Sequence, residues 1–367
     1  MFRPARWWRV YLPALCLSET GASLQAVSNT NHRVILVTGG AGFIGSELVR
    51  QLAAEGHRVC VVDNLTNGRR ANLDGVLGEN VQLVVADVRD QERMAGLLRR
   101  VDLVFHLACL GVRHSIHSPH ENHEVNATAT LRLVSLAREV SVRRFVYVSS
   151  SEVYGHAARV PMSEEHPTFP TTVYGASKLA GECYTRAFHR THGYETVVVR
   201  PFNAFGPRCH HEGDCGEVIP KFLLRCMAGQ PLIVFGDGNQ TRDFTYVGDT
   251  ARGIMLAGWA ESVVGETINL GSGREISMNE LAERIKATVG REDVRVVHEE
   301  ARPGDVLRLC ADGGKARELL GFTPRIGLPE GLAILKNWYE RGPTPVEELL
   351  VDERSRNWEL EPVPVDA

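Results

Sequence analysis

The chain has 367 residues, of which 43% are hydrophobic and 23% are charged. This composition is typical of a globular protein large enough to hold both a cofactor and a second ligand. A formal net charge of -4 gives no strong field for recruiting nucleic acid or an anionic membrane, so we expect a small-molecule partner, with no nucleic acid and no membrane.

The first 32 residues differ in composition from the rest of the chain. Arginines at positions 3, 6 and 9 precede a short apolar run that Pro13 interrupts, so we interpret this segment as a disordered extension rather than a targeting signal. Later stretches fall short of the ~20 apolar residues that a membrane span requires. The eight cysteines are scattered, several of them in apolar strand-like text, which predicts reduced thiols and a cytoplasmic protein.

From residue 33 onward, short β-branched runs alternate with longer amphipathic ones. The predicted strands are RVILVTG, HRVCVVD, VQLVVAD, VDLVFHLA, RRFVYVSS and ETVVVRP, and the longest predicted helices cover residues 43–55, 119–140 and 174–192. Parallel neighbours need crossover connections, and strands that are apolar on both faces need cover on both sides. The pattern therefore predicts an α/β fold, a Rossmann-type doubly wound parallel sheet.

After Pro201 the pattern changes to Gly- and Pro-rich segments, with helices near residues 218–229, 279–289 and 331–340. We interpret this part as a smaller C-terminal α/β lobe that binds the substrate. The predicted division is an extension at 1–32, a cofactor domain at 33–200 with a return segment at 243–268, a substrate lobe at 201–242 and 269–345, and a peripheral tail at 346–367.

The stretch TGGAGFIG places Gly39, Gly42 and Gly45 at the turn from the first strand into the first helix. Such glycines allow a tight turn and a close approach of the backbone to a pyrophosphate at the helix N-terminus. Asp63 ends the next strand, where a carboxylate can accept hydrogen bonds from the adenosine ribose and repel a 2'-phosphate. The motif predicts NAD rather than NADP, a preference weakened by Arg69 and Arg70. Asp87, at the end of the third strand, could reach the adenine.

Two further stretches, VSSSEVYG and YGASK, carry candidate catalytic residues. Tyr174 and Lys178 are four residues apart and lie on one helix face, so the ammonium is expected to lower the pKa of the phenol toward the range of a base. The serines end a parallel strand, at the sheet edge where such folds bind ligands, and Ser150 is our candidate for contacting a substrate hydroxyl.

With these motifs in view, the chain resembles an extended short-chain dehydrogenase/reductase, specifically a nucleotide-sugar epimerase related to UDP-glucose 4-epimerase. The resemblance covers about residues 33–340 and includes DNLTNG, VNAT, RPFNAFGPR, GDGNQTRDFTYV, NLGSG and ARPGDV in family order. It implies that Tyr174 deprotonates the sugar 4-hydroxyl with help from Ser150, while a hydride passes between C4 and NAD. It also implies a homodimer paired through residues 119–140 and 174–192.

The motifs and the resemblance together give three sets of site residues. The predicted catalytic residues are Ser150, Glu152, Tyr174 and Lys178. The predicted NAD contacts are Gly39, Gly42, Phe43, Ile44, Gly45, Asp63, Asn64, Asp87, Val88, Leu107, Ala108, Asn126, Ser149, Tyr174, Lys178 and Pro201. The predicted contacts to the nucleotide sugar, with a UDP-sugar expected, are Ser150, Ser151, Asn203, Val218, Arg242, Arg302 and Asp305.

The reaction within this family is left open by the loop after Ser150. Family 4,6-dehydratases carry an Asp-Glu pair there, and Ser151 cannot easily supply the acid that a departing hydroxyl needs. UDP-glucuronate decarboxylases resemble this chain in having Ser-Glu, whereas ARPGD and HLACLGVRHS are closer to epimerases. Leu309 lies near a position that limits sugar size in the family. An inactive protein that binds NAD and nucleotide sugar is a further alternative.

Two histidine-rich stretches suggest metal sites at first sight. In CHHEGDC, residues 209–215, consecutive ligand-type side chains cannot easily converge on one ion, so we interpret the stretch as a loop that covers the substrate. The histidines at 114, 117, 120 and 123 spiral around a helix that Pro119 interrupts. We therefore predict no metal site.

Overall fold

The computed structural model describes residues 32–213, 215–302 and 305–359, so most of the predicted N-terminal extension lies outside the described residues. The chain from His32 onward clusters as one compact unit. Within the described ranges, no helix is long and apolar enough to cross a membrane. The seven described cysteines are free thiols.

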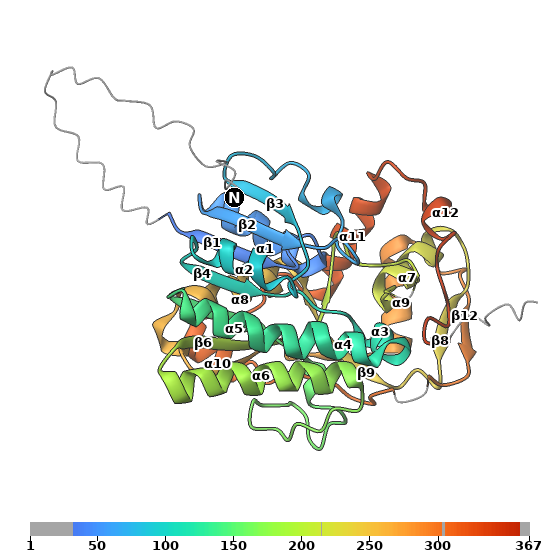
Figure 1. Ribbon diagram of the computed structural model, residues 1–367. Coiled ribbons are helices and arrows are strands. Elements are labelled where there is room, and N and C mark those ends of the chain that lie inside the picture. The colour runs from blue at the N-terminus through green and yellow to red at the C-terminus, as the bar shows by residue number, and fades with distance from the viewer. Residues whose placement is uncertain (1–31, 214, 303–304, 360–367) are drawn as a thin grey trace, which may run out of the picture. The chain divides into compact units, whose positions relative to one another are not determined.

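A seven-stranded sheet forms the centre of this unit (Figure 1). Its strands are β1 (Val34–Thr38), β2 (Arg58–Asp63), β3 (Val81–Val85), β4 (Leu103–His106), β5 (Arg144–Val148), β6 (Glu195–Pro201) and β10 (Thr267–Leu270). They pair in the order β10-β6-β5-β4-β1-β2-β3, and every pairing is parallel. The predicted doubly wound sheet is confirmed, and β10, which begins in the predicted return segment, adds a seventh strand.

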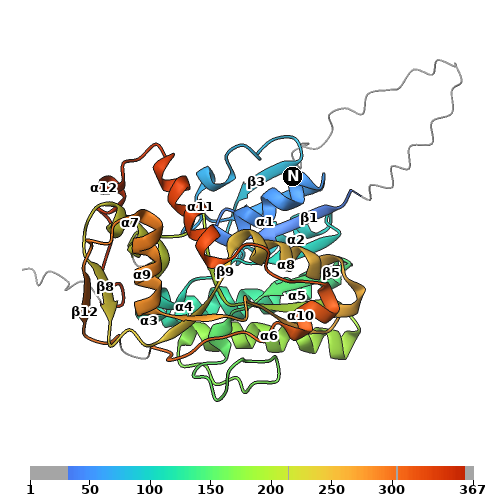
Figure 2. The same ribbon diagram turned by 180° about the vertical axis from the view of Figure 1, so that it is seen from behind.

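Helices cover both faces of the sheet, as Figures 1 and 2 show from opposite sides. One face carries α1 (Phe43–Ala54), α8 (Val247–Trp259) and α10 (Gly314–Leu320), and the other carries α2 (Gln91–Leu98), α5 (Ala129–Glu139) and α6 (Val173–His192). Alternate residues of a strand serve opposite faces: Val146 packs in the cluster with α1 and α8, whereas Phe145 packs with α2 and α5. Two separate hydrophobic cores therefore hold the sheet.

The predicted helix at 119–140 is interrupted. The segment forms α4 (Pro119–His123), a π-helical turn η2 (Glu124–Thr128) and α5, preceded by the short α3 (Val112–His117). The side-chain amide of Asn126 binds the loop at Leu110. It accepts from the Leu110 backbone N–H at 2.8 Å and donates to the Leu110 carbonyl at 2.9 Å. Short 3-10 turns also form at η1 (Arg70–Leu73), η3 (Ser151–Val153) and η4 (Glu261–Val263).

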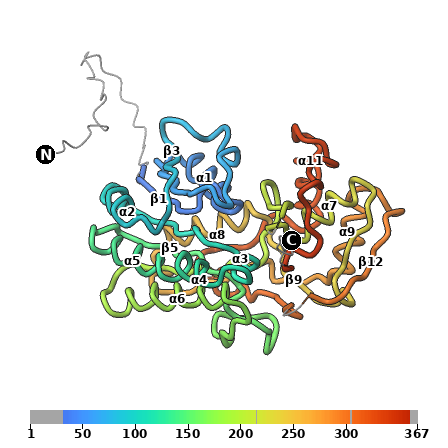
Figure 3. Tube along the Cα trace, turned by 45° about the vertical axis from the view of Figure 1, so that its right-hand side comes forward, coloured from blue at the N-terminus to red at the C-terminus, as the bar shows by residue number. Residues whose placement is uncertain are grey.

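The rest of the chain builds a second core beside the sheet's C-terminal edge, seen at the right of Figure 3. Its elements are β7 (Asn203–Phe205), α7 (Val218–Met227), β8 (Leu232–Phe235), β9 (Thr241–Tyr246), β11 (Glu275–Ser277), α9 (Met278–Val289), β12 (Val296–Glu299) and α11 (Leu328–Glu340). Strand β9 lies between β11 and β7, and β8 pairs with β12. Buried Phe222, Leu281 and Leu335 join α7, α9 and α11.

The segment after residue 345, expected to be a peripheral tail, packs against this second core instead. It forms α12 (Val346–Leu349) and then runs past α7 toward β8 and β12, in red in Figure 1. Glu353 pairs with Arg225 of α7 at 2.6 Å, Asn357 is 3% exposed, and the Trp358 ring meets the Phe235 ring edge-on at 4.6 Å. The acidic sequence suggested a peripheral tail, but a partly buried ion pair and an aromatic contact hold residues 346–359 against the second core.

Candidate active site

A pocket of about 920 Å³ lies where the C-terminal ends of the central strands face the second core. Such strand ends are where open α/β sheets bind ligands. Of the predicted site residues, these line the pocket: Gly39, Gly42, Phe43, Ile44, Gly45, Asp63, Asn64, Asp87, Val88, Leu107, Ala108, Ser149, Ser150, Ser151, Glu152, Tyr174, Lys178, Pro201, Asn203, Val218, Arg242, Arg302 and Asp305. Asn126 does not; it is 1% exposed and positions the loop at Leu110 from behind.

The glycine turn is tight enough to require its glycines. Gly39 has a φ of 69°, in the left-handed region, and a Cβ there would lie 2.7 Å from the backbone nitrogen of Ala108. A Cβ on Gly45 would lie 2.1 Å from the Gly39 carbonyl oxygen. The turn therefore brings bare backbone and the N-terminus of α1 to the pocket wall, which is the arrangement that receives a pyrophosphate.

Carboxylates end the second and third strands, as predicted. Asp63 accepts from the backbone N–H groups of Ala41, at 3.0 Å, and Leu65, at 2.8 Å, and burial raises its pKa. Asp87 is instead bonded by Arg89, which lowers the pKa of Asp87 to about 2. The Arg69 side chain pairs with Glu212 at 2.5 Å, and neither Arg69 nor Arg70 lines the pocket. This arrangement favours NAD over its 2'-phosphorylated form.

Two buried polar atoms of the pocket wall fit a bound ligand. The Ser149 hydroxyl and the Asn203 side-chain oxygen are buried and have no hydrogen-bond partner among the described residues. Leaving such groups unpaired costs about 1–3 kcal/mol each, so a ligand that bonds them would remove that cost. With the glycine turn and Asp63, these atoms fit a dinucleotide lying along the strand ends.

We expect Gly45→Ala to weaken NAD binding at least about tenfold, or about 1.4 kcal/mol. The added methyl group overlaps the Gly39 carbonyl, so the turn must open and the backbone can no longer approach the pyrophosphate. Titration of cofactor-free protein with NADH, followed by nucleotide fluorescence, measures the affinity. Gly96→Ala is the matched control, because a Cβ at Gly96 on α2 meets nothing within 4 Å. Equal affinities for both variants would contradict the pyrophosphate site.

Tyr174, Ser150 and Lys178 come together at the centre of the pocket. Tyr174 is the second residue of α6, whose N-cap Thr172 accepts from the Gly175 N–H at 3.0 Å, and its phenol lies near the Ser150 side chain, which acts to lower the pKa of Tyr174. Lys178, one turn later, is 2% exposed and donates to the Val148 carbonyl at 2.6 Å. The end of β5 and the start of α6 thus fix a hydroxyl pair and an ammonium side by side.

The predicted effect of Lys178 on Tyr174 is wrong for this arrangement. Burial raises the pKa of Tyr174 well above its ordinary value, the nearby Cys109 thiol adds to the rise, and the hydrogen bond with Ser150 opposes it. The Lys178 ammonium donates its hydrogen bond to the Val148 carbonyl and lies 4.7 Å from the centre of the Tyr147 ring. Cys109, which comes after β4 and lines the pocket, was missed among the predicted site residues, because nothing in HLACLG marks it as one.

The second core supplies the cationic side of the pocket. Arg242 of β9 and Arg302 both bond one carboxylate oxygen of Asp305, at 2.6 and 2.5 Å. Arg242 also donates to the carbonyls of Thr241 and Val306, which holds its guanidinium in place. A pair of arginines sharing one carboxylate keeps a net positive charge and suits a diphosphate.

Leu309 does not line the pocket. It is 1% exposed and packs with Tyr154, Met162 and Phe202 in a small separate core. Its neighbour Cys310 pairs through its carbonyl with the Met162 N–H at 2.7 Å, which turns the Leu309 side chain inward.

The residues of CHHEGDC point in different directions. Cys209 is buried beside the Tyr339 hydroxyl at 4.0 Å, and the His211 ring meets the Tyr339 ring edge-on. His210 and Cys215 line the pocket, as the covering-loop interpretation predicts. His114 and His117 also line it. Among the described residues, which exclude Asp214, no group of three or more His, Cys, Asp or Glu side chains is placed to hold a metal ion.

Comparisons with known proteins agree with this geometry. The model of the NAD dependent epimerase/dehydratase family matches residues 35–271. A putative UDP-glucose 4-epimerase of Methanocaldococcus jannaschii is 37% identical over 83% of this chain and 98% of its own length. UDP-glucuronic acid decarboxylase 1 of Xenopus tropicalis is 37% identical over 83% of this chain and 72% of its own length.

Solved structures extend the match to the fold. The dTDP-glucose 4,6-dehydratase of Streptomyces venezuelae, crystallised with NAD bound, superposes with a TM-score of 0.78 at 36% identity over 84% of this chain and 97% of that one. Relatives named for three different reactions thus match this chain, and the resemblance drawn from the motifs is confirmed at the level of the family. The chain belongs to the NAD-dependent epimerase/dehydratase family, and its cofactor is NAD.

Proposed function

We propose that the protein epimerises a nucleotide sugar, most plainly a UDP-hexose or UDP-N-acetylhexosamine, at C4 through a transient 4-keto sugar. The observation that carries the proposal is the placement of Ser150, Tyr174 and Lys178 on the wall of one pocket that has a dinucleotide turn on one side and paired arginines on the other. A hydroxyl pair placed between these two ends can bind and deprotonate a sugar hydroxyl.

When bound, NAD supplies the acceptor for the C4 hydride and the donor that returns it. Tyr174 takes the proton of the 4-hydroxyl, and Ser150 keeps that oxygen aligned with the tyrosine. Lys178, fixed to the Val148 carbonyl, holds its charge beside the reacting groups. Arg242 and Arg302 hold the diphosphate while the sugar turns over, so that the opposite face of C4 takes up the hydride and the 4-oxygen receives its proton back from Tyr174.

A second candidate reaction is the decarboxylation of UDP-glucuronate. It is favoured by the Ser151-Glu152 pair and by a relative of that name at 37% identity. A 4,6-dehydratase is less favoured, because Ser151 is 4% exposed and offers no acid at the position where an acid is needed. An inactive binding protein is least favoured, since Ser150, Tyr174 and Lys178 are all present. Pairing of two copies through α4, α5 and α6, and a cytoplasmic location, stay predictions.

Incubation with single substrates separates these reactions. We expect purified protein given UDP-glucose, UDP-N-acetylglucosamine or UDP-glucuronate to yield an isomer of unchanged mass from at least one of them, resolved by chromatography and mass spectrometry. Loss of carbon dioxide would establish the decarboxylase instead, and loss of water the dehydratase. Absence of turnover with these and with dTDP- and GDP-sugars, while NAD remains bound, would refute the proposed enzyme.

A further inference from the structure

The pocket wall includes a further arginine, Arg113, that the motifs did not identify. Arg113 lies in α3 and lines the pocket, and after burial the charge of Arg302 is the main factor lowering the pKa of Arg113. Arg302 and Arg242 meet at one oxygen of Asp305. Arg113 therefore lines the same pocket as this pair, as does Arg225, which is paired with Glu353.

Arg113 differs from Arg242 and Arg302 in its partner. Its Nε donates to the side-chain oxygen of Asn357 at 3.3 Å, and within the described residues no carboxylate lies at ion-pair distance from it. An amide orients a guanidinium without neutralising it. Arg242 and Arg302 share Asp305, so that pair is left with one net positive charge, whereas a nucleotide-sugar diphosphate carries a negative charge on each phosphate. Arg113 supplies the second positive charge.

Asn357 is placed by the segment that comes after α12. Its side chain also donates to the Gly216 carbonyl at 3.0 Å, next to the start of α7, and Gly213 donates to the Asp352 carbonyl at 2.7 Å. Glu353 fixes the segment to Arg225, and Trp358 fixes it to Phe235. The segment, the CHHEGDC loop and α3 thus meet beside Arg113, whose side chain lines the pocket.

We propose that Arg113, oriented by Asn357, is a third cationic contact to the substrate diphosphate, so that residues 350–359 complete the substrate site. The inference rests on the proposed function in taking a nucleotide sugar as the ligand.

Calorimetric titration of the NAD-loaded protein with UDP tests this contact, with dTDP used in parallel. We expect Arg113→Gln to raise the dissociation constant for the tighter of the two nucleotides roughly 10- to 100-fold, as loss of a charge-assisted contact does. Arg113→Lys should keep part of the affinity. Asn357→Asp should weaken binding at least about fivefold, since its carboxylate would neutralise Arg113. Arg308→Gln, outside the pocket, is the control and should change nothing.

The outcomes are separable. If Arg113→Gln binds the nucleoside diphosphate as tightly as the wild type, or loses affinity for UDP-glucuronate alone, the third-contact proposal is wrong even when the wild type epimerises. If nucleotide affinity depends on Arg113 while the wild type turns over no sugar, the proposed reaction fails and the contact stands. An unchanged affinity for NADH in each variant confirms that the fold is intact.

Discussion

Replacement of Tyr174 by phenylalanine should lower kcat roughly a thousandfold, within the range expected when a general base is removed, and should leave KM nearly unchanged. The phenyl ring keeps the packing at the start of α6, while the hydroxyl near Ser150 is lost. Initial rates of sugar interconversion at saturating NAD measure the effect. Tyr184→Phe, on the same helix but not on the pocket wall, should retain full activity.

The pH dependence of kcat is an independent test of Tyr174 as the base. Because burial raises the pKa of Tyr174, its base form is the minor one near neutral pH, and its population grows as the pH rises. Wild-type kcat should therefore increase on going from neutral to alkaline solution, whereas the residual rate of Tyr174→Phe should not follow that increase. A Tyr174→Phe enzyme with wild-type kcat would refute the assigned base.

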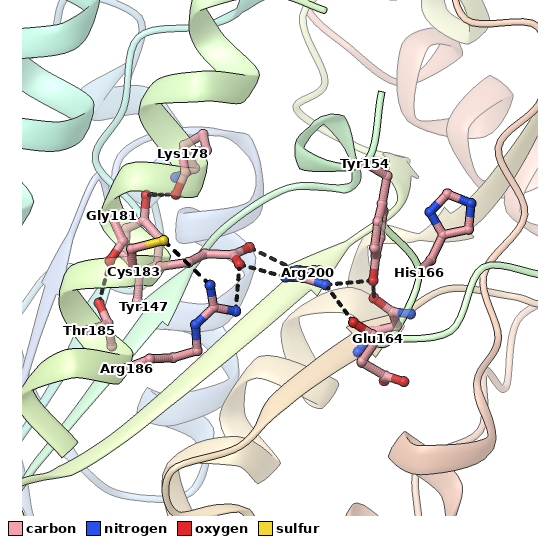
Figure 4. Close-up of polar contacts among 12 residues, drawn as sticks. Tyr147, Tyr154, Glu164, His166, Lys178, Gly181, Cys183, Thr185, Arg186 and Arg200 are labelled. Carbon is pink, nitrogen blue, oxygen red and sulfur yellow. Dashed lines mark hydrogen bonds and ion pairs between the residues drawn. The ribbon is translucent and has the colours of Figure 1, made fainter. Parts of the chain in front are cut away.

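The largest stability effects are expected at a buried charge network beneath the active site (Figure 4). Arg200 of β6 makes two parallel bonds to Glu182 of α6, at 2.8 and 2.6 Å, and both side chains are almost fully buried. Arg200 also donates to the Tyr154 hydroxyl at 2.8 Å, and Tyr154 donates to Asn269 of β10 at 2.7 Å. The network joins the catalytic helix, the loop after Ser150 and the edge strand.

Breaking this pair should cost about 3–5 kcal/mol of the free energy of unfolding, because Glu182→Met leaves the buried Arg200 without a carboxylate, and Arg200→Met leaves the buried Glu182 with only the more distant Arg186, at 3.3 Å. We expect that cost for Glu182→Met and for Arg200→Met, measured by urea unfolding at fixed NAD concentration. The double variant Glu182→Met/Arg200→Met should recover at least about 2 kcal/mol of the summed loss, since both charges are then removed together. Strict additivity of the two changes would show that the charges are not coupled.

How much the sequence could predict depended on how local the signal was. The six predicted strands and helices α1 and α6 follow from periodicity, because apolar runs at fixed spacing leave few alternatives. Strand β10, four residues long, carries no such signal. The break in the helix near Asn126 is set by bonds to Leu110, sixteen residues away, which a helical pattern cannot contain.

The site residues likewise differ in whether a local motif could predict them. Gly45, Asp63, Ser150 and Tyr174 sit in short motifs at strand ends, and all of them line the pocket. Arg113 and Asn357 are separated by 244 positions, and neither lies in a motif that names the other. The direction of the Tyr174 pKa shift was mispredicted for a related reason. The spacing of Tyr174 and Lys178 indicates a neighbouring charge but not burial, and burial is the larger cause of the shift in the Tyr174 pKa.

The placement of Asn357 has a consequence for how the protein is made. Asn357 comes 244 residues after Arg113, so a growing chain can assemble the dinucleotide turn and the central sheet long before the pocket wall behind Arg113 exists. If Arg113 acts as proposed, the nucleotide-sugar site is completed only after residues 350–359 have joined a sheet whose last strand, β10, ends at Leu270.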